Sequence, residues 1–299
     1  MSSTQELNNC IGNQWQAGTG ETIVSSCPYD ESVVAVGKGA SQSQVDAAFV
    51  AARLAAAPWW RIGCEQRIAI VKKYAELVRE HAVELAELIS RETGKPRWET
   101  LTEAGAVASK VDISIESFRD RRNTRSFEMG SSKAVTRFKP HGVCGVLGPF
   151  NFPAHLPNGH IVPALICGNT VVFKPSEITP ATGQWMMQKW LDAGLPEGVL
   201  NLVHGGREVG QAIAGHGQLD GLFFTGSSNA GVALSKTLAP TPQKILALEM
   251  GGNNPLIVHE ASDIEAAAYL TVLSAYITSG QRCSCARRLI VVDGSDANH

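Results

Sequence analysis

The alternation of short apolar runs with helical segments between residues 143 and 250 limits the possible folds more than any other feature. Five apolar runs have the length of buried strands: Val143–Leu147, Thr170–Phe173, Leu200–Val203, Leu222–Thr225 and Ile245–Leu248. Helical segments separate them, near residues 157–166, 180–192, 207–214 and 229–238. This βαβ alternation predicts an α/β fold in which helices cover both faces of a parallel sheet. Ligands bind such a sheet at the carboxyl ends of its strands, so functional residues are expected directly after each strand.

The first 120 residues show a different pattern. Residues 1–40 are rich in Gly, Ser, Thr and Val, which predicts short strands and turns. Ser43 is placed to cap a helix that ends at Pro58. An apolar stripe of helical spacing then begins near residue 65 and ends at a Gly-Lys-Pro stop signal. A further helix is expected over residues 98–118.

The charge balance argues against a nucleic-acid-binding protein. The chain has 299 residues, with 26 Lys and Arg against 28 Asp and Glu, so its formal net charge is −2. Nucleic-acid-binding domains carry a basic excess instead. The basic segment RDRRNTR at residues 119–125 is open to a role as a polyanion patch. It lacks interleaved aromatic residues, however, and is interpreted as a solvated connection.

Other classes are excluded by what the sequence does not contain. The N-terminus has no basic segment followed by an apolar one, and no run approaches the roughly 20 apolar residues of a membrane span. We therefore expect a cytoplasmic protein that does not enter a membrane. The seven cysteines are scattered and lack the spacing of zinc ligands, so they are expected to be free thiols and no metal site is expected.

Two segments that follow predicted strands have the chemistry of a dinucleotide site. A turn at the start of a helix exposes backbone N–H groups that suit a phosphate. Its residues are Gly226, Ser227, Ser228, Asn229, Ala230 and Gly231. After an earlier strand, Lys174 and Glu177 could contact a ribose, and the charge of Glu177 would repel a 2′-phosphate and favour NAD over NADP. Taken alone, each segment also fits an ordinary strand-to-helix turn or a surface ion pair.

Three residues could carry covalent chemistry. Cys283 lies in a Gly-rich turn next to an arginine, where a lowered thiol pKa would make it a nucleophile. Cys285 is its rival, because spacing does not choose between them and either could be a buried structural thiol. Glu249 ends an apolar strand beside two glycines, which suits a general base. Asn151 offers a neutral amide that could donate to an oxyanion.

In combination, five segments resemble the NAD(P)-dependent aldehyde dehydrogenase superfamily, in the order that this family has them. They are GPFNFP, FKPSE, FTGSSNAG, LEMGGNNP and YITSGQRCSCAR. The resemblance extends from about residue 14 to residue 292. Two positions depart from the pattern: the loop that follows NLV is one residue shorter than is usual, and Thr278 stands where many members carry Asn.

The resemblance implies a role for each candidate. Cys283 would be the nucleophile, Glu249 the general base and Asn151 an oxyanion donor for an aldehyde substrate. Lys174 and Glu177 would contact the adenosine ribose of NAD, and the turn of residues 226–231 would lie along its phosphates. It also implies a Rossmann-like NAD-binding domain over residues 1–250, with an oligomerisation arm near 120–142. Residues 251–299 would begin a second α/β catalytic domain, and members of the family are homo-oligomers.

The resemblance also suggests a substrate and a truncation. Segments 152–163, 204–208 and 249–255 resemble a branch of the superfamily that oxidises N-succinylglutamate 5-semialdehyde in bacterial arginine catabolism. The alternative substrate is another small acidic semialdehyde. His155, Asn158 and His160 are candidate substrate contacts by position, with core or capping roles left open. Family members continue beyond residue 299, so the chain is expected to be C-terminally truncated.

Hypotheses of three classes remain open. The chain could be an active dehydrogenase, or a catalytically incomplete fragment that binds a nucleotide without turnover. A redox or metal protein built on Cys283 and Cys285 is disfavoured, because two thiols one residue apart lack the usual metal-ligand spacing.

Overall fold

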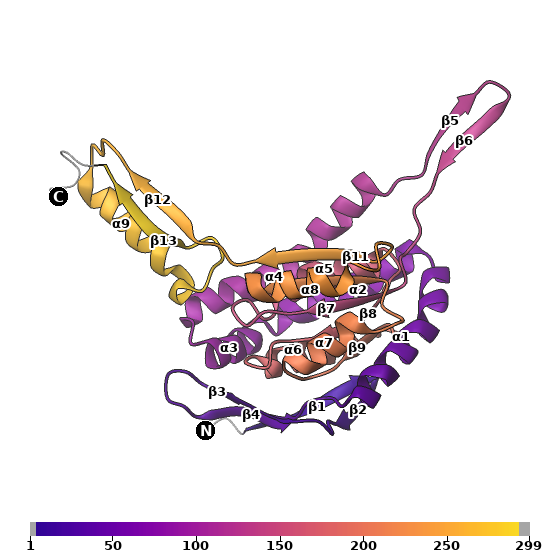
Figure 1. Cartoon of the computed structure of the whole chain (residues 1–299), viewed down its shortest axis with the longest axis horizontal. Coiled ribbons are helices and arrows are strands. Elements are labelled where there is room, and N and C mark those ends of the chain that lie inside the picture. The colour runs from indigo at the N-terminus through magenta and orange to yellow at the C-terminus, as the bar shows by residue number, and fades with distance from the viewer. Residues whose placement is uncertain (1–3, 293–299) are drawn as a thin grey trace.

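A computed structural model of the chain, which describes residues 4–292, contains the predicted parallel sheet at its centre (Figure 1). Its central strands are β7 (Val143–Leu147), β8 (Thr170–Lys174), β9 (Leu200–Leu202), β10 (Gly221–Gly226) and β11 (Ile245–Met250). They lie in the order β11-β10-β7-β8-β9, and each neighbouring pair is parallel. The prediction of a parallel core is confirmed, and the carboxyl ends of these strands meet at one edge.

N-terminal strands extend this sheet and make it mixed. They are β1 (Gln5–Ile11), β2 (Gln14–Ala17), β3 (Thr22–Ser26) and β4 (Val33–Lys38). β1 pairs antiparallel with β9 and β2 and parallel with β4, and β3 pairs antiparallel with β4. The expectation of short strands over residues 1–40 is confirmed. The sequence did not indicate that they would join the central sheet.

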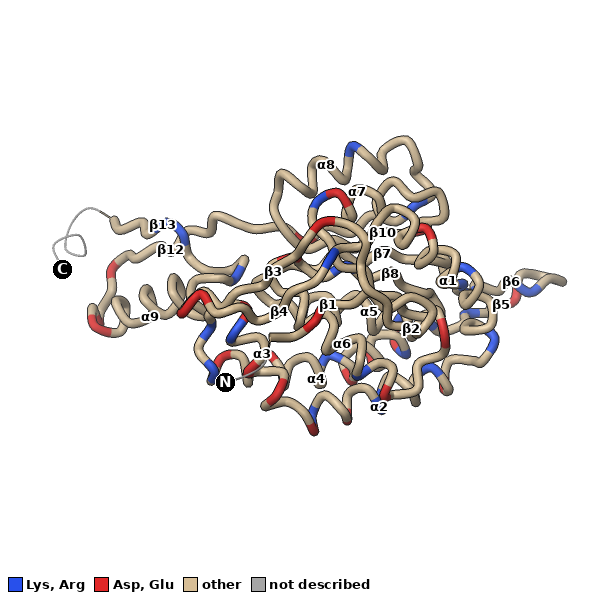
Figure 2. The backbone as a smooth tube through the Cα atoms, turned by 90° about the horizontal axis from the view of Figure 1, so that it is seen from below, with Lys and Arg blue, Asp and Glu red and all other residues tan. Residues whose placement is uncertain are grey.

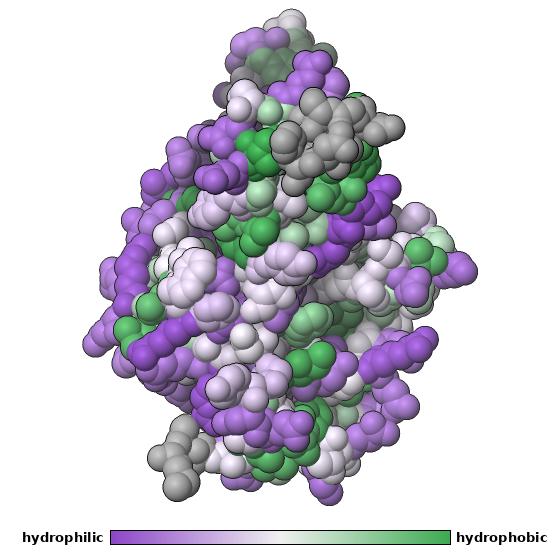
Figure 3. All heavy atoms as spheres, turned by 90° about the vertical axis from the view of Figure 1, so that its left-hand side faces the viewer, coloured by the Kyte–Doolittle hydropathy of each residue, from purple (hydrophilic) through white to green (hydrophobic). Residues whose placement is uncertain are grey.

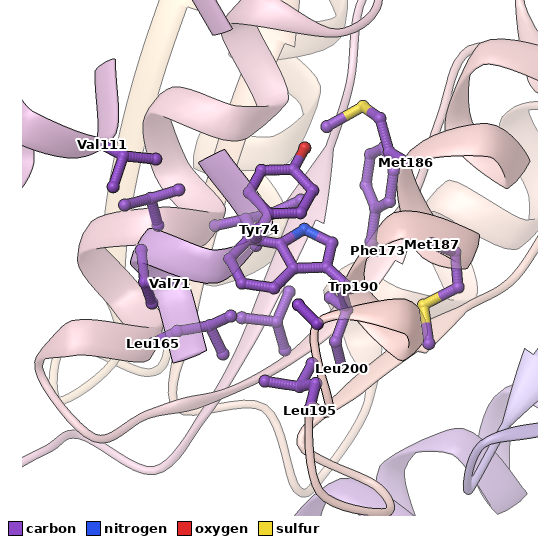
Figure 4. Packing of buried hydrophobic residues seen from close by; sticks show 14 of the residues in the cluster. Val71, Tyr74, Val111, Leu165, Phe173, Met186, Met187, Trp190, Leu195 and Leu200 are labelled. Carbon is purple, nitrogen blue, oxygen red and sulfur yellow. The ribbon is translucent and has the colours of Figure 1, made fainter. Parts of the chain in front are cut away.

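Helices cover both faces of the sheet, as predicted. They are α1 (Gln42–Arg61), α2 (Cys64–Glu80), α3 (Ala82–Thr93), α4 (Arg97–Arg121), α5 (His155–Ile166), α6 (Pro180–Asp192), α7 (Arg207–Gly215) and α8 (Ser228–Leu238). Side chains that alternate along β7 enter different cores: Cys144 and Val146 pack with α2 to α6, whereas Val143 and Leu147 pack with α1, α7 and α8. Figure 4 shows the first core, where Tyr74 and Trp190 stack with ring centroids 3.8 Å apart.

Three helix boundaries differ from the prediction. α1 is capped by Ser41 rather than Ser43, because Gln44 accepts a hydrogen bond from the Ser41 backbone N–H at 3.1 Å and completes a capping box. The helix also continues through Pro58 to Arg61. Proline removes the bond to the carbonyl of Leu54, but Leu54 is exposed, so water can satisfy that carbonyl. The long helix expected from residue 65 is divided at His81 into α2 and α3.

Two units project from this body (Figure 1). One is the hairpin of β5 (Arg125–Met129) and β6 (Ser132–Thr136), in the region expected to be an arm. The other contains β12 (Asn254–Val258), α9 (Ile264–Tyr276), a 3-10 turn η1 (Ile277–Gly280) and β13 (Ala286–Val291). No residue of α9 is buried, and Figure 3 shows apolar atoms gathered on this end of the molecule.

Charged side chains are distributed without a strong bias. Figure 2 shows Lys and Arg interspersed with Asp and Glu over the helices.

None of the helices that the structure describes is long and apolar enough to cross a membrane. The described residues also contain no group of three or more His, Cys, Asp or Glu side chains that could hold a metal ion.

Candidate active site

The ends of β10 and β11 bring Glu249 near a half-buried histidine. Thr225 and Glu249 are register partners on these neighbouring parallel strands. His160, on α5, lies with its Nε2 3.4 Å from the Thr225 hydroxyl and stacks on Phe223. Burial lowers the pKa of His160, and the nearby Glu249 carboxylate opposes that shift. Glu249 itself is exposed, so its carboxylate is accessible at the edge where ligands bind.

Asn151 and the cysteine turn meet, although 130 positions separate the contacting residues. Asn151 lies in the loop that follows β7, and its side-chain amide donates a hydrogen bond of 2.6 Å to the Gln281 carbonyl. The preceding turn is tightly wound, because Thr278, Ser279 and Gly280 all have a positive φ, of 55°, 54° and 69°. A threonine in this conformation is rare, since its branched side chain disfavours it.

The two rival cysteines have opposite environments. Cys283 is exposed, whereas Cys285 is 2% exposed and its thiol donates to the Ile277 carbonyl at 3.6 Å. Asn254, at the start of β12, donates from its side chain to the carbonyls of Cys283 and Cys285, at 2.6 and 3.2 Å. The segment that follows Glu249 therefore holds the cysteine segment in place, and only one of the two thiols can meet a substrate.

A recess of about 280 Å³ lies beside the cysteine turn. Its walls are formed by Leu270, Leu273, Ser274, Ile277, Arg282, Ser284 and Cys285. Arg282 brings a positive charge to this recess, and its guanidinium lies 5.8 Å from the centre of the Phe152 ring. The recess is therefore mainly apolar, with one cationic side chain in its wall.

The predicted phosphate turn forms the exposed start of α8. Ser227 caps the helix, because its hydroxyl accepts from the Ala230 N–H at 3.3 Å. The N–H groups of Ser228 and Asn229 lie in the first turn, where a helix offers no internal acceptor. Gly226 accepts from the Gly251 N–H at 3.2 Å, which joins this turn to the segment after Glu249. A side chain in place of Gly231 would collide with the Met250 sulfur.

The other two predicted cofactor contacts, Lys174 and Glu177, differ in their exposure to solvent. Lys174 is buried, and its ammonium donates to the carbonyls of Pro175 and Gly205, at 2.9 and 2.7 Å, and to Glu177 at 3.4 Å. Burial lowers its pKa. Lys174 thus holds the loop after β9 in place and has all three hydrogens engaged. The Glu177 side chain is half-exposed and remains accessible to ribose hydroxyls. The exposed helix start and this carboxylate together fit a dinucleotide.

Among the three candidate substrate contacts, Asn158 is in the core. It is fully buried, and its amide donates to the Val107 carbonyl at 2.8 Å, so the structural alternative holds for this residue. His155 lies at the start of α5, where burial and the neighbouring Lys110 lower its pKa. His160 is the candidate that reaches the site, through Thr225 and Glu249.

Sequence reasoning missed three residues that contact the site, Lys95 in the connection between α3 and α4 and Glu99 and Glu103 on α4. Lys95 donates to the Asn151 carbonyl at 2.7 Å and forms a buried ion pair of 2.5 Å with Glu103. Glu99 accepts from the Thr278 N–H at 2.6 Å. The signal was present: Lys95, Glu99 and Glu103 are four residues apart, which places the two acids on one face of a helix. The Gly-Lys-Pro segment was interpreted only as a helix stop.

Comparison with known proteins places this geometry in a family. The sequence profile of the aldehyde dehydrogenase family matches residues 15–297. N-succinylglutamate 5-semialdehyde dehydrogenase from Ectopseudomonas mendocina (strain ymp) is 54% identical over 284 residues, which cover 95% of this chain and 58% of that protein. The chain thus spans little more than half the length of this relative.

Two solved structures have the same fold. The NADP-dependent glyceraldehyde-3-phosphate dehydrogenase from Bacillus halodurans C-125, complexed with NADP, matches with a TM-score of 0.91 and 30% identity, covering 99% of this chain and 63% of that one. An NAD-dependent benzaldehyde dehydrogenase from Corynebacterium glutamicum matches with a TM-score of 0.86 and 35% identity, covering 95% and 63%. Because the family profile matches residues 15–297 of its 299 residues, the chain belongs to the aldehyde dehydrogenase family.

Proposed function

We propose that the chain carries the chemistry that oxidises N-succinylglutamate 5-semialdehyde to N-succinylglutamate with NAD. The observation that carries this proposal is the hydrogen bond from the Asn151 amide to the carbonyl of Gln281, two residues before the exposed Cys283. Glu249, which is also exposed, precedes the segment in which Asn254 holds the Cys283 carbonyl. The choice of substrate rests on the relative of that name, at 54% identity, and is supported by the cationic Arg282 in the recess beside the cysteine turn.

The proposed chemistry begins at Cys283. Its thiolate adds to the aldehyde carbon, which forms a C–S bond and places negative charge on the oxygen. An amide nitrogen carries two hydrogens, so Asn151 can donate to Gln281 and to this oxyanion together. One well-placed donor of this kind stabilises the transition state by about 3–4 kcal/mol.

The later steps leave the thiol free again. Bound NAD supplies the acceptor for the hydride that leaves the former aldehyde carbon. Glu249 then takes a proton from a water molecule, whose oxygen attacks the Cys283 thioester and releases the acid. The residues proposed to hold NAD are the turn of residues 226–231 and Glu177. The carboxylate of Glu177 favours NAD over NADP, because it would repel a 2′-phosphate.

A second candidate is favoured by one observation, that the chain spans 58% of its relative. In this alternative, the sheet binds NAD without turnover. A third candidate keeps the chemistry and changes the substrate to another small acidic semialdehyde.

The hairpin of β5 and β6 is the proposed contact between copies of the chain, as its resemblance to an oligomerisation arm implies.

Absorbance at 340 nm tests the proposal. The chain, its Cys283→Ala variant and its Cys285→Ala variant are each incubated with NAD and N-succinylglutamate 5-semialdehyde, and NADH formation is followed. We expect turnover in the parent chain and in Cys285→Ala, and its loss in Cys283→Ala. Bound NAD without turnover in any of the three would support the incomplete fragment. Turnover that survives Cys283→Ala would contradict the nucleophile assignment.

A further inference from the structure

The segment that joins α3 to α4 contacts both loops of the candidate site. We call residues Thr93–Glu103 the α3–α4 junction. It lies outside the strand ends and outside the motifs that resemble the family. Its side chains nevertheless reach the Asn151 loop on one side and the cysteine turn on the other.

On the Asn151 side, the contact is a buried ion pair. The Lys95 ammonium donates to the Asn151 carbonyl at 2.7 Å and lies 4.2 Å from the centre of the Phe152 ring. Its partner Glu103 accepts from the backbone N–H groups of Ala154 and His155, at 3.3 Å each. The side chains of Lys95 and Glu103 are both 1% exposed. This pair therefore holds the loop at both of its ends, in a place from which water is excluded.

On the cysteine side, the junction supplies two acceptors. Glu99, which is 5% exposed, accepts from the Thr278 N–H at 2.6 Å. The carbonyl of Thr93 accepts from the Gln281 side chain at 2.9 Å. Thr278 and Ser279 both have a positive φ, a conformation that residues other than glycine adopt only when their surroundings impose it. The Glu99 carboxylate is the group that engages the first N–H of this strained turn.

We propose that Lys95 and Glu99 are positioning residues, which fix the Asn151 amide relative to the Cys283 thiol. Lys95 acts through the main chain of Asn151, and Glu99 acts through the turn that ends at Cys283. The role rests on the proposed function of Asn151 and Cys283. The geometry requires both anchors on one rigid segment, because a shift of about 1 Å between reacting groups can lower a rate about 100-fold.

Glu99 is the sharper residue to test. Removal of Lys95 would leave the Glu103 carboxylate buried without its partner, which destabilises a fold strongly. Glu99→Met removes the acceptor at similar length, and Glu99→Gln keeps an oxygen that can accept from the Thr278 N–H. Glu116→Met is the matched control, because Glu116 is an exposed acid on the same helix.

The first measurement is steady-state NADH formation by the four chains, with NAD and N-succinylglutamate 5-semialdehyde. We expect Glu99→Met to lower kcat about 10- to 100-fold, with the KM for NAD within about twofold of the parent value. Glu99→Gln should stay within about threefold of the parent in both parameters, and Glu116→Met should be unchanged. Equal kcat in Glu99→Met and the parent, or equal loss in Glu99→Met and Glu99→Gln, would overturn the proposal.

A second measurement separates this proposal from the function on which it rests. Alkylation of Cys283 by iodoacetamide needs no turnover, and mass spectrometry of the peptide locates the adduct. We expect Glu99→Met to change the alkylation rate at least about fivefold, while Glu99→Gln and Glu116→Met leave it at the parent value. If the parent chain does not form NADH, the proposed function fails, and the alkylation rate of Cys283 alone tests the positioning role of Glu99. An unchanged rate in Glu99→Met would then overturn the positioning role.

Discussion

At the scale of single residues, burial of a histidine next to Lys174 makes the stability of the fold depend on pH. His204 follows β9 and is fully buried, with its backbone N–H donated to the Asn9 side chain at 2.7 Å. Burial lowers the pKa of His204 to about 3, and the adjacent Lys174 ammonium lowers it as well. Burial therefore favours the neutral imidazole in the folded chain.

Because His204 is neutral in the fold, we predict that the folded chain loses stability in mild acid. The unfolded chain binds a proton at His204 below about pH 6.5, and the folded chain does not until about pH 3. The contribution of His204 is thus complete above pH 6.5 and falls as the pH decreases towards 3. Between pH 7.5 and 5.5, we expect the free energy of unfolding to fall by about 1.4 kcal/mol more in the parent than in His204→Asn.

Urea unfolding of both chains at the two pH values measures this difference. Any effect of the substitution on packing is present at both pH values and cancels in the comparison. Equal pH dependence in the two chains would mean that His204 is protonated, or exposed, in the fold.

At the scale of elements, the start of α8 combines a structural cap with a binding surface. The Ser227 hydroxyl caps the helix through Ala230, and the exposed N–H groups of the same turn face the predicted phosphates. The dipole of a helix favours negative charge at this end. The two roles can be separated, because an aspartate can cap a helix and also repels a phosphate.

Two substitutions of Ser227 should therefore have opposite effects. Ser227→Ala removes the cap and should lower the free energy of unfolding by about 1 kcal/mol, with the Kd for NAD within about threefold of the parent. Ser227→Asp should keep the stability and raise the Kd at least about tenfold. Thr237→Asp is the charge control, because Thr237 is exposed at the other end of α8. Urea unfolding and a fluorescence titration with NAD give the two quantities. A normal Kd in Ser227→Asp would exclude this turn from the phosphate site.

The pattern of apolar residues and turn signals along the chain predicted the strands of the central sheet. The strands β7, β8, β9, β10 and β11 were expected within two residues of their bounds, because each is a short apolar run between turn signals. The continuation of α1 through Pro58 was missed, because whether the lost hydrogen bond can be tolerated depends on the exposure of the preceding turn.

The candidate site was predictable in part for the same reason. Residues that follow strands could be placed at one edge of the sheet, and the motifs singled out Asn151, Glu249 and two cysteines. The environments that distinguish Cys283 from Cys285, and the contacts of Lys95 and Glu99, arise between segments far apart in the chain. The spacing of Glu99 and Glu103 indicates a shared helix face, but one sequence does not indicate which distant segments that face contacts.

At the scale of the whole molecule, the body built on the central sheet adjoins a unit, made of β12, α9 and β13, with uncovered apolar surface. Its exposed apolar side chains are Tyr269, Leu270, Val272, Leu273 and Tyr276 on α9 and Leu289, Ile290 and Val291 on β13. Apolar surface of this kind marks a place where protein packs. The candidate site lies where this unit joins the body, since Asn254 and Gln281 tie the cysteine turn to both parts. We propose that the chemistry occurs where this unit joins the body, on the Cys283 sulfur.

Trapping of the covalent intermediate tests that claim most directly. In Glu249→Gln, the group proposed to activate water is lost, while attack by Cys283 is not. With NAD and N-succinylglutamate 5-semialdehyde, we predict a burst of NADH no larger than the amount of chain and an acyl adduct on the peptide that contains Cys283. The adduct should be absent from Glu249→Gln/Cys283→Ala. An adduct on Cys285, or NADH formation by Glu249→Gln at the parent rate without an adduct, would contradict the account.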